Sequence, residues 1–168
     1  MKNKAFLFSI VTSFTLILSA CADQPEEKKT ASNEEHADHG EHSASGDIRE
    51  ETEGLSSLPS FLSDKPEDMQ MIYSAAAKNR ELLENIPCYC GCGESANHKN
   101  NYDCFVNENK ENGAIVWDDH GTKCGVCLEI AAQSVLQLEE GKSIKEIRSE
   151  FDEKYKEGYA KPTPTPEV

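Results

Sequence analysis

The cysteines are the residues of this sequence whose type and spacing carry the most chemistry. Six of the seven stand close together, at Cys88, Cys90, Cys92, Cys104, Cys124 and Cys127. The first three alternate with other residues in the hexapeptide Pro87-Cys88-Tyr89-Cys90-Gly91-Cys92. The proline and the glycine favour a curled loop that turns the sulfurs inward. Soft thiolates select Cu(I), Zn(II) or iron–sulfur clusters, so this pattern predicts a polythiolate metal site.

The last two cysteines stand at the predicted start of a helix. Cys124 and Cys127 are three positions apart and therefore share one helix face. The exposed N–H groups of a first helical turn favour anions, which lowers the pKa of thiols placed there. His120 stands just before this pair, and His98 is a further candidate ligand. The predicted metal ligands are the six cysteines and His120.

Copper is the metal that this arrangement favours. Zinc sites usually use pairs of cysteines with two to four residues between them, whereas the alternating spacing here suits thiolates that bridge more than one Cu(I). An accessory feature is the acidic stretch that contains His36, His39 and His42. Short histidine-rich tracts of this kind capture Cu(II), Ni(II) or Zn(II). We therefore expect Cu(I) as the bound metal, with zinc as the alternative.

Two other interpretations of the cysteines stay open. An even number of cysteines in a small secreted domain is also typical of a disulfide framework, which would make the chain a stapled, non-catalytic surface interaction module. Cys124 and Cys127 also have the spacing of a redox motif, which would suit a thiol–disulfide oxidoreductase, but the βαβ surroundings of such motifs are missing. No nucleophile–base pair or phosphate-binding loop is recognisable, so we expect no enzyme.

The cysteine pattern resembles a known family. The hexapeptide PCYCGC is followed by Phe105 directly after Cys104, by Trp117 and His120, and by Cys124-x-x-Cys127. Together these residues resemble a poorly characterised class of bacterial lipoproteins that is defined by a PCYCGC motif. The resemblance covers roughly residues 60 to 140. It implies an extracytoplasmic lipoprotein with a cysteine-rich domain, and it implies no established chemistry.

The N-terminus predicts secretion and a lipid anchor. Lys2 and Lys4 precede an apolar run from Ala5 to Leu18, which is typical of a signal peptide and shorter than the roughly 20 residues of a membrane-spanning helix. The tetrapeptide that ends at Cys21 resembles the lipobox of bacterial lipoproteins. We therefore expect a signal peptide over residues 1–20, a lipid such as palmitate on Cys21, and a location on the extracytoplasmic face of the cell membrane.

The charge of the chain limits its partners. It has 31 acidic residues against 17 basic ones, for a formal net charge of −14. So acidic a surface repels nucleic acid and suits cations. The expected partners are the membrane, reached through the lipid, and metal ions. An extracytoplasmic copper enzyme is the expected recipient if the protein captures, stores or delivers copper.

The elements that must position the cysteines are predicted to be mainly α-helical. Residues 21–59 have few large apolar side chains and are expected to be a disordered tether rich in His and Glu. Residues 159–168 are expected to be a proline-rich tail. Between them, residues 60–158 predict a small three-helix domain with a cysteine-rich central loop. Helical periodicity spans about 63–86, 123–140 and 143–157, and Ser143 with Glu146 predicts a capping box.

Overall fold

The structure, a computed structural model, describes residues 40–42 and 46–168. The predicted signal peptide over residues 1–20 and the predicted lipidation site Cys21 lie outside the described residues. Within the described part of the chain, no helix is both long enough and apolar enough to cross a membrane.

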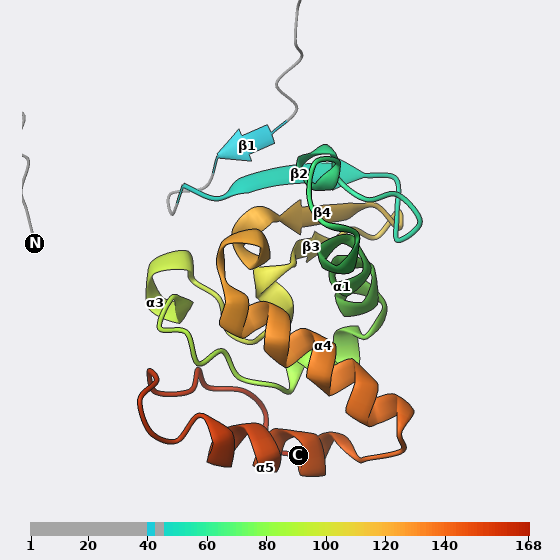
Figure 1. Cartoon of the computed structure of the whole chain (residues 1–168). Helices are drawn as coiled ribbons and strands as arrows, with labels where there is room; N and C mark the ends of the chain where they lie inside the picture. The colour runs from blue at the N-terminus through green and yellow to red at the C-terminus, as the bar shows by residue number, and fades with distance from the viewer. Residues whose placement is uncertain (1–39, 43–45) are drawn as a thin grey trace, which may run out of the picture. The chain divides into compact units, whose positions relative to one another are not determined.

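A four-stranded antiparallel sheet forms one layer of the described part of the chain (Figure 1). The strands lie in the order β1-β2-β4-β3 and span Gly40–His42 (β1), Ile48–Thr52 (β2), Val106–Asn109 (β3) and Ile115–Asp118 (β4). Strand β4 is central because it pairs with both β2 and β3, and Trp117 stands opposite Glu50 on one side and Val106 on the other. The inner face of the sheet is therefore supplied mainly by the apolar residues of β4.

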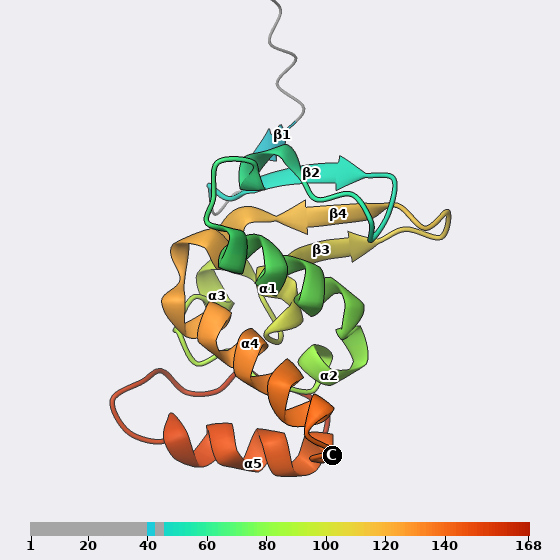
Figure 2. The same cartoon turned by 45° about the vertical axis from the view of Figure 1, so that its right-hand side comes forward.

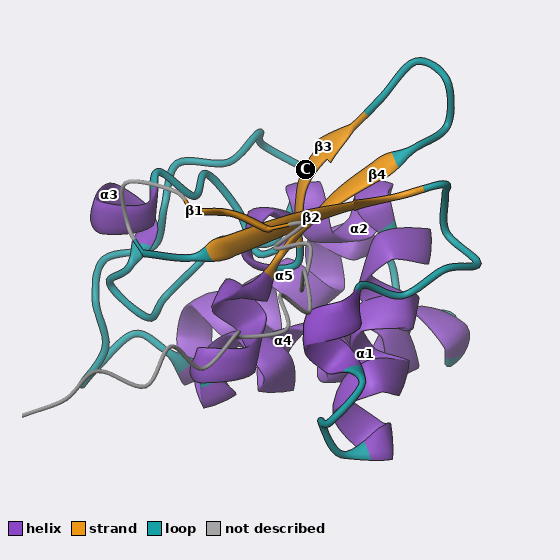
Figure 3. Cartoon of the chain, turned by 90° about the horizontal axis from the view of Figure 1, so that it is seen from above, coloured by secondary structure: helices purple, strands orange, loops and turns teal. Residues whose placement is uncertain are grey.

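The helices lie on one side of the sheet. The α-helices span Glu67–Lys78 (α1), Arg80–Glu84 (α2), Gly93–Ala96 (α3), Gly125–Glu139 (α4) and Ile144–Lys154 (α5). Short 3₁₀ turns span Ser60–Leu62 (η1), Tyr102–Cys104 (η2) and Asp119–Lys123 (η3). Figures 1 and 2 show α1 and α4 between the sheet and α5, and the view from above in Figure 3 shows these helices beneath the strands.

The hydrophobic core joins these layers. Trp117 of β4, Tyr73 of α1 and Ile130 of α4 are all fully buried. Phe105 meets the ring of Tyr73 edge-on, with the two centroids 5.0 Å apart and the planes at 79°, which is a preferred geometry for aromatic pairs. Cys88, Cys104 and Cys127 belong to this core. The packing of the core therefore sets their backbone positions.

The prediction of a mainly α, three-helix domain is wrong, because the fold is mixed α/β. The strands are short, and β2 pairs with β4, a segment far away in the sequence, whereas β3 and β4 form a local hairpin. Strand β2 has the sequence IREET and is only partly buried, so it lacks the apolar alternation by which a strand is recognised. The predicted helical segments do contain helices, and the capping box of Ser143 and Glu146 is confirmed at the start of α5.

Both ends of the predicted domain also differ from the expectation. Strand β2 lies inside residues 21–59, the segment expected to be a disordered tether, and pairs with β4. The expected proline-rich tail is not free either, and we call residues 158–164 the C-terminal strap. Its Ala160 N–H donates to the carbonyl of Tyr89 at 3.2 Å, and its Thr163 N–H donates to the carbonyl of Cys88 at 3.1 Å. The strap therefore runs along the cysteine-rich hexapeptide.

Candidate metal centre

The six cysteines of the described part converge in one place as free thiols. They come from three segments: the loop after α2, the turn η2 and the start of α4. The Sγ atoms of Cys88 and Cys90 are 3.0 Å apart, those of Cys104 and Cys127 are 3.3 Å apart, and those of Cys90 and Cys127 are 3.7 Å apart. These contacts link the three segments into one thiol cluster.

Three of the thiols form a buried group that we call the inner triad. Cys88, Cys104 and Cys127 are at most 1% exposed, and their Sγ atoms lie within 4.8 Å of one another. Sulfurs bonded to one tetrahedral ion at about 2.3 Å lie roughly 3.8 Å apart. Asn101 holds the segments together, since its N–H donates to the carbonyl of Ile86 and its side-chain amide donates to the carbonyl of Cys127. The inner triad is thus spaced as ligands of one soft metal ion.

The other three thiols, Cys90, Cys92 and Cys124, are partly exposed, and we call them the outer thiols. Cys90 and Cys124 form a second group with Cys127, and Cys90 and Cys92 form a third with His120, each with its ligand atoms within 4.8 Å. Gly91 has a φ of +83°, a backbone conformation that suits glycine. Because Cys90 and Cys127 each belong to two groups, the three groups form one continuous set of donors.

The backbone around His120 is held by the core. His120 lies in η3, and its N–H donates to the carboxylate of Asp118 at 3.0 Å. The Tyr73 hydroxyl donates to the carbonyl of Asp118 and accepts from the N–H of Thr122. Gly121 packs so closely that a Cβ there would lie 2.8 Å from both the Tyr73 hydroxyl oxygen and a ring carbon of Phe105. The position of the imidazole therefore follows from tight aromatic packing.

Two buried imidazoles border the thiols. The Nδ1 atom of His120 lies 3.3 Å from both carboxylate oxygens of Asp47. The Nδ1 atom of His98 lies 3.6 Å from the Sγ atom of Cys104, and the two rings meet edge-on with centroids 4.6 Å apart. Both Nε2 atoms are buried and have no hydrogen-bond partner among the described residues. Each of the two rings that border the thiols thus has one nitrogen without a partner in the described part of the chain.

The thiols of the cluster have pKa values that are shifted in different directions. Contact with the thiol of Cys124, and then with that of Cys127, lowers the pKa of Cys90 to about 4. Contacts with Cys127 and then Cys88 lower the pKa of Cys104 to about 7, although burial opposes this shift. The pKa of Cys92 is instead raised to about 12, by burial and by its contact with Cys90. Neighbouring outer thiols therefore differ strongly in acidity.

The pKa values of the two histidines are shifted in opposite directions. Contact with the thiolate of Cys90 and the charge of Asp47 raise the pKa of His120 to about 9, while burial opposes the rise. Burial, followed by the nearby charge of His120, lowers the pKa of His98. The surroundings of His120 thus stabilise a positive charge between two anions, and a bound metal ion is one way to supply that charge.

The structure brings together all seven predicted metal ligands, namely the six cysteines and His120. His36 and His39 of the predicted accessory tract lie outside the described residues, and His42 lies in β1 with no side chain described. The sequence indicates His98 only as a further candidate ligand, and it gives no indication of Asp47. Asp47 carried no signal, because it stands in the acidic segment that was expected to be disordered.

A comparison with known protein families shows which family this chain belongs to. Residues 10–168 match the family described as "protein of unknown function with PCYCGC motif". The chain belongs to this PCYCGC family. No curated protein and no solved structure matches the chain. The family match extends beyond residues 60–140, on which the resemblance rested, and includes Asp47, β2 and the C-terminal strap. The Cys and His groups of this PCYCGC protein can hold a metal ion.

Proposed function

We propose that the protein binds Cu(I) through its thiol cluster and captures, stores or delivers copper outside the cell membrane. The observation that carries this proposal is the sharing of Cys90 and Cys127 between overlapping groups of donors. One tetrahedral ion uses four ligands, and the cluster has more sulfurs than that. Soft thiolates select Cu(I), and shared thiolates suit several Cu(I) ions bridged by sulfur.

The proposed location supports the same function. The predicted lipid on Cys21 would anchor the chain at the extracytoplasmic face, and the predicted tract of His36, His39 and His42 would collect metal ions for the thiols. The formal net charge of −14 attracts cations. An extracytoplasmic copper enzyme is the proposed recipient of the metal.

A Cu(I) titration tests the proposal. The full-length chain is purified in detergent without oxygen, titrated with Cu(I) against a competing chelator, and followed by native mass spectrometry. We expect cooperative uptake of more than one Cu(I) per chain, and single Cys90→Ser and Cys127→Ser variants should each lose most of it. A chain that takes no Cu(I) from the competitor while its cysteines are reduced would overturn the proposal.

The stapled interaction module is a second candidate, favoured by the 3.3 Å between the sulfurs of Cys104 and Cys127. Disulfide formation would need only a modest approach of atoms already so close. Thiols trapped by acid in intact cells, then alkylated and located by peptide mass spectrometry, separate the two functions. Free thiols at both positions support copper binding, whereas complete oxidation supports the stapled module.

A further inference from the structure

We propose that Cys90, Cys92 and His120 form a second metal site, with mixed nitrogen and sulfur donors, for a divalent ion of the Zn(II) class. This inference deepens the proposed function and rests on it, because both sites need Cys90 as a reduced thiolate. The second site is distinct in composition from the inner triad, which offers sulfur alone.

The unpartnered nitrogen of His120 is the first observation. His120 is only 9% exposed, and its Nε2 atom has no hydrogen-bond partner among the described residues. Buried polar atoms without a partner are rare in folded proteins and call for an explanation such as a bound ion. His120 also has a ligand nitrogen within 4.8 Å of the sulfurs of Cys90 and Cys92. A metal ion among these three atoms would satisfy the imidazole.

The contact with Asp47 is the second observation. Asp47 is 3% exposed, and its carboxylate faces the Nδ1 atom of His120 at 3.3 Å. A histidine that binds a metal through one nitrogen usually donates the N–H of the other to a carboxylate, which sets the tautomer and the ring orientation. With the proton on Nδ1, the lone pair of Nε2 is available to a metal. Asp47 is therefore a positioning residue that acts through His120.

The sheet places this carboxylate. Asp47 immediately precedes β2, and the pairing of Arg49 with Asp118 brings the start of β2 beside η3. The ammonium group of Lys123 lies 3.2 Å from the carboxylate of Asp47 and forms an ion pair with it. The strand that extends the fold before residue 60 thus supplies a part of the site.

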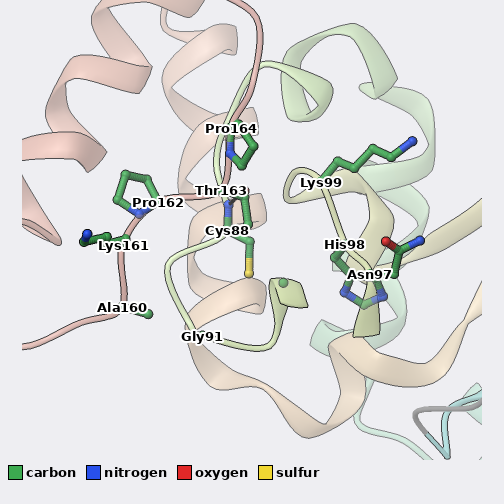
Figure 4. Close-up of a pocket in the computed structure, with 11 residues that line it drawn as sticks. Cys88, Gly91, Asn97, His98, Lys99, Ala160, Lys161, Pro162, Thr163 and Pro164 are labelled. Atoms are coloured by element: carbon green, nitrogen blue, oxygen red, sulfur yellow. Dashed lines mark hydrogen bonds between the residues drawn. The ribbon is translucent and has the colours of Figure 1, made fainter. Parts of the chain in front are cut away.

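The donor set indicates the class of metal. Zinc accepts thiolate and imidazole together, and a site with three protein ligands keeps a fourth position for water or an exchanging ligand. A pocket of about 470 Å³ lies directly beside these donors and is lined by Cys90, Cys92, His120, Cys124 and part of the strap. An ion held here would remain reachable from solvent, unlike one in the inner triad. Figure 4 shows Thr163 of the strap next to Cys88, the member of the inner triad to which the strap is hydrogen-bonded.

Co(II) is the probe that tests the second site, because its thiolate charge-transfer bands and visible bands report sulfur ligands and tetrahedral geometry. The reduced, metal-free full-length chain is titrated with Co(II) and then with Zn(II). The sulfur bands exclude ions held by the tether histidines alone. We expect one Co(II) with sulfur bands, displaced by Zn(II), and X-ray absorption of the Zn(II) form with two sulfurs and one imidazole nitrogen.

Variants separate positioning from ligation. His120→Asn should remove the nitrogen ligand and shift the Co(II) bands. Asp47→Asn should leave the band positions unchanged and weaken Co(II) affinity by about 10–100-fold, the usual effect of losing a carboxylate that orients a ligand. Cys104→Ser is the matched control, because it should lower the Cu(I) stoichiometry and leave the Co(II) spectrum intact.

Two results would overturn the second site. One is an all-sulfur environment for the Zn(II) ion, and the other is a Co(II) spectrum that changes in Cys104→Ser but not in His120→Asn. Failure of the proposed function is distinct, since a chain that rejects Cu(I) yet binds Co(II) at Cys90, Cys92 and His120 would lose the copper role and keep the site.

Discussion

The inner triad and the outer thiols use the same donor atom but are held in different ways. The inner triad joins three segments inside the core, and its sulfurs are almost completely shielded from solvent. The outer thiols lie at the open edge, beside the pocket and the strap. Burial excludes competing ligands and water, whereas exposure permits ligand exchange. If the cluster binds metal as proposed, we expect the inner triad to retain it and the outer thiols to exchange it.

The largest expected effect tests whether the two regions are unequal. Cys127→Ser removes a sulfur that both regions share, whereas Cys92→Ser removes one from the outer edge alone. We expect Cys127→Ser to weaken Cu(I) affinity by more than the roughly 10–100-fold typical of losing a group that only orients a ligand. Cys92→Ser should weaken it much less. Affinities measured against a Cu(I) chelator check this, and equal losses would mean that the cluster is one undivided site.

The second prediction sharpens the contrast inside the outer thiols. The pKa of Cys90 is lowered to about 4, by Cys124 first, and that of Cys92 is raised to about 12, by burial first. The thiolate is the form that reacts with iodoacetamide. In the metal-free chain, alkylation of Cys90 should therefore be almost independent of pH near neutrality, while that of Cys92 should rise about tenfold per pH unit.

Time-resolved peptide mass spectrometry measures both alkylation rates in one sample. The low pKa of Cys90 also makes its thiolate a weaker nucleophile. This reduces the difference between the alkylation rates of Cys90 and Cys92 near neutral pH without reversing it. Cys104 is fully buried and provides an internal control that should remain unlabelled in the folded chain. Parallel pH profiles for Cys90 and Cys92 would contradict the prediction.

The sequence predicted the metal ligands well and predicted much less about the elements that position them. Cysteine spacing was enough to predict that Cys88, Cys90, Cys92 and the pair near α4 would meet, because close sequence neighbours and a shared helix face bring sulfurs together. The helices followed from apolar periodicity and from the capping box. These are local signals, which do not depend on how distant segments pair.

Strand β2 and the residues that it positions had no such signal. Asp47 reaches His120 only because β2 pairs with β4, and β2 is a charged segment without apolar alternation. The strap has no such signal for a related reason, since two of its contacts with Cys88 and Tyr89 are backbone hydrogen bonds that no side-chain pattern records. Long-range pairing of weakly apolar segments is thus what single-sequence patterns leave out.

The third prediction tests whether packing around η3 supports the outer edge specifically. Gly121→Ala would bring a Cβ to 2.8 Å from the Tyr73 hydroxyl oxygen and a Phe105 ring carbon. Overpacking of this kind typically costs about 1–3 kcal/mol, so we expect a lower free energy of unfolding in a urea titration. Because η3 carries His120, Co(II) affinity should fall as well, whereas Cu(I) bound by the inner triad should be less affected.

Gly125→Ala is the matched control for this prediction. Gly125 begins α4, and a Cβ there would have no neighbouring atom within 4 Å. Alanine is the better helix former, so stability should be unchanged or slightly higher. If the two glycine variants had the same free energy of unfolding and the same Co(II) affinity, the position of His120 would not depend on tight packing at η3.

The smallest expected effect concerns the strap and the inner triad. The hydroxyl oxygen of Thr163 accepts a hydrogen bond from the N–H of Cys88 at 2.8 Å. Thr163→Val keeps the shape and removes the acceptor, which should lower the free energy of unfolding by about 1 kcal/mol. It should also speed alkylation of Cys88, because the strap would open more often over that thiol.

A control residue stands just beyond the strap, two positions after Thr163. The hydroxyl of Thr165 is buried and has no hydrogen-bond partner among the described residues, so Thr165→Val should be neutral or slightly stabilising, since it removes an unsatisfied polar atom. Urea titrations and Cys88 alkylation rates of both variants form the measurement. Faster labelling in Thr163→Val alone would mean that the inner triad is shielded by the hydrogen bond of the Thr163 hydroxyl as well as by the core. Equal labelling in the two variants would mean that the core alone shields it, and the contrast with the outer thiols would then owe nothing to the strap.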